Sequence, residues 1–289
     1  MVAMRWPDGK VVCPRCGSEN ISYLEKARLY KCYAKHEKAK FSLKVGTIFE
    51  DSPLGLDKWL MAMWLLANCK NGISSYELHR AIGITQKSAW HVLHRLRTAM
   101  TVGSIEKLSG TVEADETYIG GDAKNMHKAK RDRFEMTHGR RDHKVAVLGM
   151  VERKGRVRAK VIPAAQGKHI IPEIREAIEK GSNLMTDGAT AYEKLANDYV
   201  HEAVNHAIEY VRGNVHTNGI ENFWSLLKRT IKGTYVSVSP AHLQKYVEEQ
   251  TFRFNERKGD DQTRFVALLD SISGKRLTYN ELIGYAAGR

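Results

Sequence analysis

Hydrophobic residues recur along the chain with two different periods. Between residues 57 and 100 they return every three or four positions, as at Trp59 and Met63, which is the period of helices packed on one face. Further along, the pattern changes to short apolar runs at 145–151 and 157–163, with a charged turn between them. Such runs are typical of β-strands joined in a hairpin. The sequence therefore predicts a helical segment followed by a domain that mixes strands and helices.

The helical segment contains the signals of a helix-turn-helix. Ser74 and Glu77 have the spacing of a capping box, in which each side chain binds the backbone of the other. Gly83 is expected to end that short helix, and Thr85 to cap a longer helix over residues 86–100. A short helix, a glycine turn and a longer helix are typical of DNA-binding proteins, although a plain helical connector has the same pattern.

If this pair of helices binds DNA, the second helix enters the major groove with its first residues near the base edges. The residues predicted to lie there are Gln86, Lys87 and Ser88. His91 and Arg95 come further along the same helix and are predicted to reach phosphates.

The stretch 111–121, TVEADETYIGG, combines a strand pattern with three acids. Asp and Glu are poor strand formers, and like charges repel, so the stretch is either a polar edge strand or one wall of a cation site. Side chains alternate along a strand, so Glu113 and Asp115 share one face and Glu116 takes the other. We therefore single out Asp115 and expect the two glutamates to be supporting or solvated groups.

The order of elements after residue 106 predicts an RNase H-like fold, a mixed sheet flanked by helices. A meander of three strands precedes a helix at 170–178, a strand at 183–186, a helix from about residue 190 and one more strand near 201–206. Asp187 follows the strand at 183–186, and sites in α/β folds gather at the carboxyl ends of strands. Capping of the next helix is the ordinary alternative for this aspartate.

The stretch 216–229, HTNGIENFWSLLKR, predicts a helix with two further candidate residues. Glu221 and Lys228 are seven positions apart, two turns, and therefore share a face. Taken singly, a first-turn acid and a solvated lysine explain both. Together with Asp115 and Asp187, however, Glu221 completes a set of oxygen ligands suited to two Mg²⁺ or Mn²⁺ ions, with Lys228 placed to hold a phosphate.

Cysteine spacing predicts a second metal site near the start of the chain. Cys13 and Cys16 form a C-x2-C knuckle, and Cys32 and His36 follow as a second pair, so the four can bind one tetrahedral zinc. A reduced knuckle with Cys32 merely buried is the alternative. The fourth cysteine, Cys69, is expected as a core thiol within an apolar helix.

Charge and composition favour a nucleic-acid partner. The 289-residue chain has a net charge of +13, and its first 100 residues hold 16 Lys and Arg against 8 Asp and Glu. The basic stretch 122–144, with Arg140 and Arg141, is expected to be a mobile loop, either a solvated insertion or an arm on DNA. No apolar run approaches the roughly 18 residues of a membrane span, and no signal peptide is evident, so we expect a cytoplasmic, DNA-associated protein.

The sequence predicts four segments. They are a zinc ribbon at 1–50, a helix-turn-helix domain at 51–105, an RNase H-like catalytic domain at 106–260 and a C-terminal extension at 261–289.

Three blocks, VEADETYIGG, TDGATAY and HTNGIENFWSLLKR, resemble the signature blocks of DDE transposases from bacterial insertion sequences. The chain is most similar to the group with a zinc ribbon before an RNase H-like domain, although His36 stands where such ribbons usually have cysteine. The resemblance implies Asp115, Asp187 and Glu221 as metal ligands and Lys228 as a DNA contact, and we expect the adjacent Arg229 to contact DNA as well. Asn218 and Asn222 flank Glu221 and are alternatives for the third ligand.

The resemblance also implies an activity. Such an enzyme binds the terminal inverted repeats of its element as a homodimer or larger assembly, cuts strands at the 3′ ends and joins them to double-stranded target DNA. An RNase H-like nuclease or resolvase that cuts without joining, and a zinc-containing regulator without activity, are the alternatives.

Overall fold

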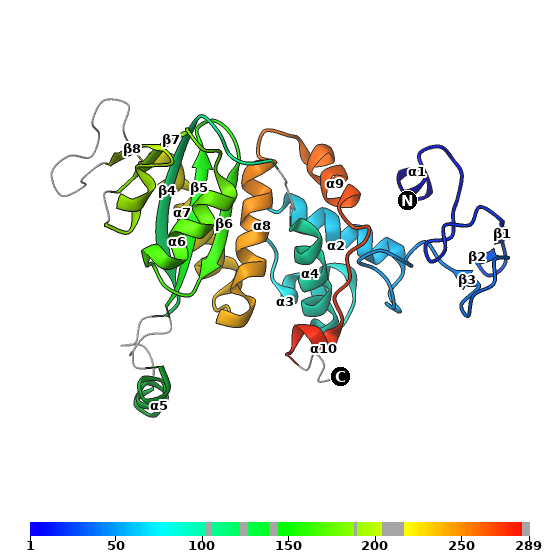
Figure 1. The fold of residues 1–289 in the computed structure, drawn as a ribbon. Helices are drawn as coiled ribbons and strands as arrows, with labels where there is room; N and C mark the ends of the chain where they lie inside the picture. The colour runs from blue at the N-terminus through cyan, green and yellow to red at the C-terminus, as the bar shows by residue number, and fades with distance from the viewer. Residues whose placement is uncertain (102–105, 122–126, 139–143, 188–189, 204–216, 285–289) are drawn as a thin grey trace. The chain divides into compact units, whose positions relative to one another are not determined.

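The computed structural model describes residues 1–101, 106–121, 127–138, 144–187, 190–203 and 217–284 (Figure 1). Contacts divide the chain into two units, one of Met1–Met100 with Gly259–Arg289 and the other of Thr101–Lys258. The second unit begins and ends close to the predicted catalytic domain. The segment expected as a C-terminal extension groups with the N-terminal residues instead of standing alone.

The first unit begins with a small antiparallel sheet. After the short helix α1 (Val2–Arg5), strands β1 (Ile21–Leu24), β2 (Leu29–Cys32) and β3 (Lys40–Phe41) pair in the order β1-β2-β3. A minor core of Trp6, Cys13, Cys32 and Phe41 lies within it. So few buried side chains supply little folding energy, which makes a stabilising metal the physical expectation for this segment.

Helices complete the first unit: α2 (Leu56–Asn68), α3 (Ser75–Ile82), α4 (Gln86–Met100), α9 (Asp261–Asp270) and α10 (Tyr279–Leu282). The predicted capping box of Ser74 and Glu77 is confirmed, and Gly83 ends α3 in the left-handed region with φ 62°. Thr85 caps α4, because its Oγ1 accepts from the backbone N–H of Ser88 at 3.2 Å. The facing ends of α3 and α4 were therefore predictable from their capping residues.

The second unit is built on a five-stranded mixed sheet. Its strands are β4 (Thr111–Ile119), β5 (Val145–Glu152), β6 (Val157–Ile162), β7 (Asn183–Thr186) and β8 (Val200–Ala203), in the order β6-β5-β4-β7-β8. The first three form an antiparallel meander, and β7 and β8 continue the sheet in parallel. This order confirms the predicted RNase H-like architecture.

Helices cover both faces of this sheet (Figure 1). On one face, α6 (Gly167–Ala177) and the 3₁₀ helix Thr190–Leu195 pack on a core that includes Val112 and Ala114 of β4. On the other face, α7 (Asn218–Arg229) packs on Val147 and Val151 of β5 through its apolar side. The alternation of side chains along the strands thus sends neighbouring β4 residues into different cores.

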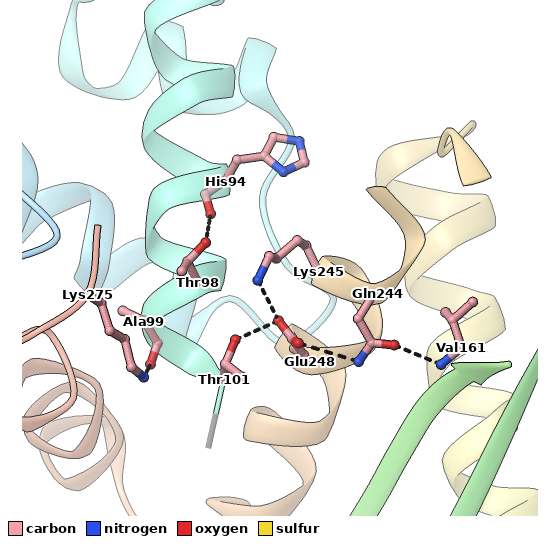
Figure 2. Close-up of polar contacts among 9 residues, drawn as sticks. All are labelled: His94, Thr98, Ala99, Thr101, Val161, Gln244, Lys245, Glu248 and Lys275. Atoms are coloured by element: carbon pink, nitrogen blue, oxygen red, sulfur yellow. Dashed lines mark hydrogen bonds and ion pairs between the residues drawn. The ribbon is translucent and has the colours of Figure 1, made fainter. Parts of the chain in front are cut away.

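After α7 the chain continues as a π-helix (Thr230–Tyr235), a 3₁₀ turn (Pro240–His242) and α8 (Leu243–Asn255). Strand β6 is the edge of the sheet, and α8 covers that edge with polar side chains. Gln244 Oε1 accepts from the N–H of Val161 at 2.7 Å, and Asn255 Oδ1 accepts from that of Val157 at 2.7 Å (Figure 2 shows the first bond). Glu248, which Figure 2 also shows, accepts from Thr101 at 2.7 Å. Backbone groups that would otherwise invite another strand are thereby satisfied.

Two local expectations were wrong. The stretch predicted as a loop contains helix α5 (Lys128–His138), because Lys, Ala, Arg, Glu and Met favour helix even without an apolar face. Arg140 and Arg141 lie outside the described residues. Helix α2 ends at Asn68, before Asn71-Gly72, so Cys69 lies just past the helix, partly exposed, and is not a core thiol. Within the described part of the chain, no helix is long and apolar enough to cross a bilayer.

Candidate functional site

Sheet register brings the two predicted aspartates together. Thr111 of β4 pairs with Asn183 of β7, and this offset of 72 residues is also the one that separates Asp115 from Asp187. Asp187 follows the last residue of β7, at the carboxyl end of the strand parallel to β4. Continuing the ladder therefore places Asp187 beside Asp115.

The surroundings of Asp115 concentrate negative charge. Its Oδ2 accepts a hydrogen bond from Trp224 Nε1 of α7 at 2.8 Å. Burial raises the pKa of Asp115, the bond from Trp224 opposes that shift, and the charges of Asp187 and Glu221 add to it. All three predicted acids thus lie near one another in the second unit.

Glu221 reaches this group from the first turn of α7. Its side chain is exposed, and its Oε1 accepts from Thr217 Oγ1 at 3.2 Å just before the helix. The position of Glu221 therefore depends on how α7 is held over the sheet.

Glu113 holds the start of α7, a role that the sequence indicated only as supporting or solvated. Its Oε2 accepts from the backbone N–H groups of Gly219 at 2.7 Å and Ile220 at 3.0 Å, and its Oε1 pairs with Arg153 Nε at 3.0 Å. Only 1% of Glu113 is exposed. A buried carboxylate at a helix N-terminus satisfies orphan donors and complements the helix dipole. The alternation that put Glu113 on the face of Asp115 was the signal for this role.

Gly149 of β5 makes room for α7 directly opposite Asp115. The two residues are register partners, and a Cβ at Gly149 would lie 2.5 Å from the ring of Trp224 and 2.7 Å from Ile220. Only a glycine lets the Trp224 ring approach the strand closely enough for its N–H to bind Asp115. Sequence reasoning did not single out Gly149, because an isolated glycine in a strand has several explanations.

Glu116 faces the opposite side of the sheet, as alternation predicted. Tyr192 Oη donates to Glu116 Oε1 at 2.6 Å, and the tyrosine is fully buried. Burial raises the pKa of Glu116 to about 7, the bond from Tyr192 opposes the shift, and the charges of Asp115 and Asp187 add to it. Glu116 is therefore neither an edge group nor solvated, and its carboxyl belongs to the same concentration of negative charge.

The donor set of the three acids fits a hard divalent cation. Carboxylate oxygens are the ligands that Mg²⁺ and Mn²⁺ prefer, and positive charge would relieve the repulsion among the acids, which adds to the effect of burial on the pKa of Asp115. The acids nevertheless remain further apart than a closed ligand cluster. Of the side chains that the structure describes, the one group with all its ligand atoms within 4.8 Å of one another is Cys13, Cys16, Cys32 and His36.

That cysteine and histidine cluster has the dimensions of a zinc site. Cys16 Sγ lies 3.6 Å from Cys32 Sγ, and Cys13 Sγ lies 3.7 Å from His36 Nε2. A tetrahedron with bonds of about 2.3 Å has edges of about 3.8 Å. Burial alone would raise the pKa of Cys13, but hydrogen bonds from backbone and thiol neighbours outweigh it and lower the pKa, which favours the thiolate that binds metal. All four predicted ligands are brought together.

The residues predicted to contact DNA from α4 have different exposures. Lys87 is exposed and lies 4.9 Å from the ring of Tyr279. Gln86 and Ser88 are half-buried, and Gln86 donates to Ser75 at 2.8 Å. His91 packs edge-on against the same Tyr279, whose helix the sequence did not link to α4.

Arg95 differs from the expectation of a phosphate contact. Only 5% of it is exposed, its Nη2 donates to the carbonyl of Glu50 at 2.6 Å, and its guanidinium lies over the Trp59 ring. Side chains at its position on α4 point into the helical core, so Arg95 does not present its charge to solvent. Lys228 and Arg229, at the end of α7, are both exposed.

Comparisons with known proteins match two parts of the chain to transposase domains. Residues 107–255 match the ISXO2-like transposase domain, and residues 1–34 match the transposase zinc-ribbon domain, a match that ends before His36. The chain is 30% identical over 240 residues to an uncharacterized protein in transposable element ISH50 of Halobacterium salinarum, covering 79% of this chain and 80% of the relative. It is also 30% identical over 103 residues to an uncharacterized transposase-like protein of Haemophilus influenzae, covering 35% of this chain and 83% of that protein.

Proposed function

The chain belongs to the ISXO2-like transposase family, and we propose that it cuts DNA strands at the ends of an insertion sequence and joins them to target DNA by two-metal catalysis. The observation that carries the proposal is the group of acids around Asp115. Asp187 and Glu221 come from a strand end and a helix, and both lie near enough for their charges to raise the pKa of Asp115. Acids gathered from three elements against their own repulsion support a site for cations.

Asp115, Asp187 and Glu221 would hold two Mg²⁺ or Mn²⁺ ions through their carboxylate oxygens. When bound, the ions supply charge that activates a water or 3′-hydroxyl and stabilises the leaving oxygen. Trp224 fixes Asp115 Oδ2 and with it the orientation of this carboxylate. Glu113 and Gly149 hold α7, and with it Glu221, at a constant position over the sheet. Cleavage and joining are both phosphoryl transfers, so one such site serves both steps.

Exposed cations would hold the DNA. Lys228 and Arg229 extend from the same helix as Glu221 and would contact phosphates beside the acids. In the first unit, Lys87 with Gln86 and Ser88 begins α4 and would face base edges of the terminal repeat, and the same unit contains the zinc-ribbon segment. Two ends must be processed together, so a homodimer or larger synaptic assembly is part of the proposal.

Replacement of Asp115 by asparagine tests the catalytic site. The Asp115→Asn chain should cleave DNA carrying the sequences that flank its gene at least about 1000-fold more slowly in Mn²⁺, because a ligand charge is lost. Its affinity for the same DNA should stay within about twofold. Asp270→Asn, an exposed aspartate at the end of α9, is the matched control and should cleave normally. Unchanged cleavage by Asp115→Asn would show that the site lies elsewhere.

A strand-transfer assay separates the transposase from a nuclease. With pre-cut ends and a supercoiled target, the proposed enzyme forms joined products, whereas an enzyme that only cuts forms none. The Asp115→Asn chain should form none in either case.

A further inference from the structure

A cavity of about 450 Å³ lies in the second unit, between the end of β4 and the end of α7. Tyr118 and the Gly120-Gly121 turn line it from the end of β4, and Lys228, Lys232 and Val236 line it from the end of α7 and the π-helix. Strand residues advance about 3.3 Å each, so Tyr118 and Ile119 lie about 10 to 13 Å along β4 from Asp115. That length corresponds to three or four stacked nucleotides at about 3.4 Å each.

The lining has two chemical halves. Lys144, Lys228 and Lys232 supply positive charge, and no acidic side chain lines the cavity among the residues the structure describes. The remaining side chains are mostly apolar or aromatic: Tyr118, Ile119, Ile231, Val236 and Val238. A phosphate suits the first half, and the flat face of a base suits the second.

The cavity is too small to enclose a base pair of a duplex. Ligand cavities of about 300 to 1,000 Å³ hold one small molecule, so about 450 Å³ accommodates a single nucleotide and not a base pair with its backbones. A base can enter only after it leaves the helical stack.

Val236 has the properties of a wedge at the mouth of this cavity. It is 77% exposed, unusual for a valine, and its φ of 61° with ψ of −54° is a strained conformation for a β-branched residue. The N–H of Ser237 donates to the carbonyl of Tyr235 at 2.6 Å, which closes a γ-turn of the rare positive-φ kind. Strain of this kind persists only where the surroundings enforce it, and it clusters at functional sites.

A buried polar network between the π-helix and α8 holds the γ-turn at Val236 in place. Tyr235 Oη donates to Glu249 at 2.5 Å, Thr230 Oγ1 donates to Gln250 at 3.1 Å, and Arg253 pairs with Glu249. Glu249, Gln250 and Arg253 all belong to α8 and are buried. Both ends of the π-helix are thus tied to α8, and π-helical segments are frequent at functional sites.

We propose that this cavity holds one unpaired nucleotide of the DNA end during cleavage, with Val236 inserted where the nucleotide leaves the duplex. The base lies against Tyr118 and Val236, and the lysines bind its phosphates. The inference rests on the proposed transposase function and adds to it a requirement for local unpairing within a few nucleotides of the cut. Apolar side chains inserted between base steps are a known means of opening a duplex.

The test compares two DNA probes with the full-length chain carrying Asp115→Asn, so that neither probe is cut. Both are fluorescent duplexes of the sequence flanking the gene, one fully paired and one with three unpaired nucleotides at the element end. Fluorescence anisotropy should show tighter binding of the unpaired probe. Val236→Gly should reduce that preference about tenfold, because the apolar contact with the unpaired base is lost, while the affinity for the paired probe stays the same.

Glycine accepts φ of 61°, so Val236→Gly should fold, and a valine that only forms a turn would leave the preference unchanged. Lys232→Ala should reduce the affinity for the unpaired probe more than the affinity for the paired probe. Lys168→Ala, an exposed lysine on α6 across the sheet, is the control and should change neither.

The inference would be overturned if the Asp115→Asn chain bound both probes with equal affinity. It would also be overturned if adding Lys232→Ala reduced the affinity for both probes by the same factor. Metal-dependent cleavage and joining by the chain with Asp115 intact test the proposed function separately. Cleavage without any preference for the unpaired probe rejects only the nucleotide cavity, and preference without cleavage rejects only the proposed function.

Discussion

The two groups of candidate metal ligands in this chain are assembled in opposite ways. In the first unit, three cysteines and a histidine bring their ligand atoms within 4.8 Å of one another. In the second unit, Asp115, Asp187 and Glu221 are near neighbours but more widely spaced, and Asp115 is fixed by a tryptophan rather than by the other acids. The contrast follows from charge. Thiols and an imidazole attract or tolerate one another, whereas three carboxylates repel and need a rigid framework.

The two units therefore differ in what stabilises their folds. The ribbon has a minor core, so its cluster must contribute stability directly when metal binds. The acidic site lies on a sheet with a substantial core on each face, and its acids reduce stability unless cations balance them. Removal of zinc should therefore unfold the ribbon, while removal of the proposed cations from the acidic site should leave the fold of the second unit intact.

The strongest test of the comparison is removal of zinc. Cys32→Ser, or chelation of the full chain, should abolish protection of β1, β2 and β3 in hydrogen exchange, because structural zinc contributes about 10 to 16 kcal/mol. Strands β4 to β8 should keep their protection. Cys69→Ser is the matched control, since Cys69 is outside the cluster. Retained protection of the ribbon after chelation would mean that its core suffices without metal.

A smaller effect is expected from disturbing the framework of the acidic site. Gly149→Ala places a Cβ 2.5 Å from Trp224, so we expect a loss of about 1 to 3 kcal/mol in the free energy of unfolding. The shift of α7 also moves Glu221, and a displacement of about 1 Å can slow catalysis roughly 100-fold. Urea unfolding and a cleavage assay measure the two effects.

Gly233→Ala is the control for that substitution, because nothing lies within 4 Å of the added atom and its φ is ordinary. This variant should cleave like the parent chain and should lose no stability, since alanine at an ordinary φ is neutral or slightly stabilising. Normal cleavage by Gly149→Ala would show that the position of α7 does not limit the reaction.

Much of this organisation could be predicted from periodicity and spacing. The strands 145–152, 157–162 and 183–186 follow apolar runs bounded by turn residues, and the RNase H-like fold followed from the succession of elements along the chain. The capping box at Ser74 was predictable because it depends on residues three positions apart. Local rules of this kind need no knowledge of the tertiary structure.

The residues that hold the site together could not be found in this way. Glu113 caps a helix that begins more than 100 positions later, and Gly149 is required by a ring from the same distant helix. Arg95 looked like a surface cation, because sequence does not show which side of a helix the rest of the unit covers. The features that the sequence did not predict were therefore long-range contacts, and these are made by residues that position the site.

The smallest expected effect concerns Glu116, whose pKa is raised to about 7 mainly by burial. The folded chain then binds more protons than the unfolded chain between about pH 4.5 and 7, so this group makes stability fall as pH rises through that window. The Gln side chain of Glu116→Gln has no proton to lose. At pH 8 this variant should therefore unfold at a higher urea concentration than the parent chain, with a free energy of unfolding about 1 to 2 kcal/mol larger. The gain is partial because a neutral amide accepts more weakly from Tyr192.

The test measures urea unfolding of the parent chain and of Glu116→Gln at pH 5 and pH 8, with and without Mg²⁺. Cations near Asp115 favour the charged form of its neighbours, so added Mg²⁺ should reduce the advantage of Glu116→Gln at pH 8 and leave pH 5 unchanged. Glu176→Gln, an exposed residue of α6, should show neither change. If Mg²⁺ fails to narrow the difference at pH 8, Glu116 does not share the electrostatic environment of the proposed cation site.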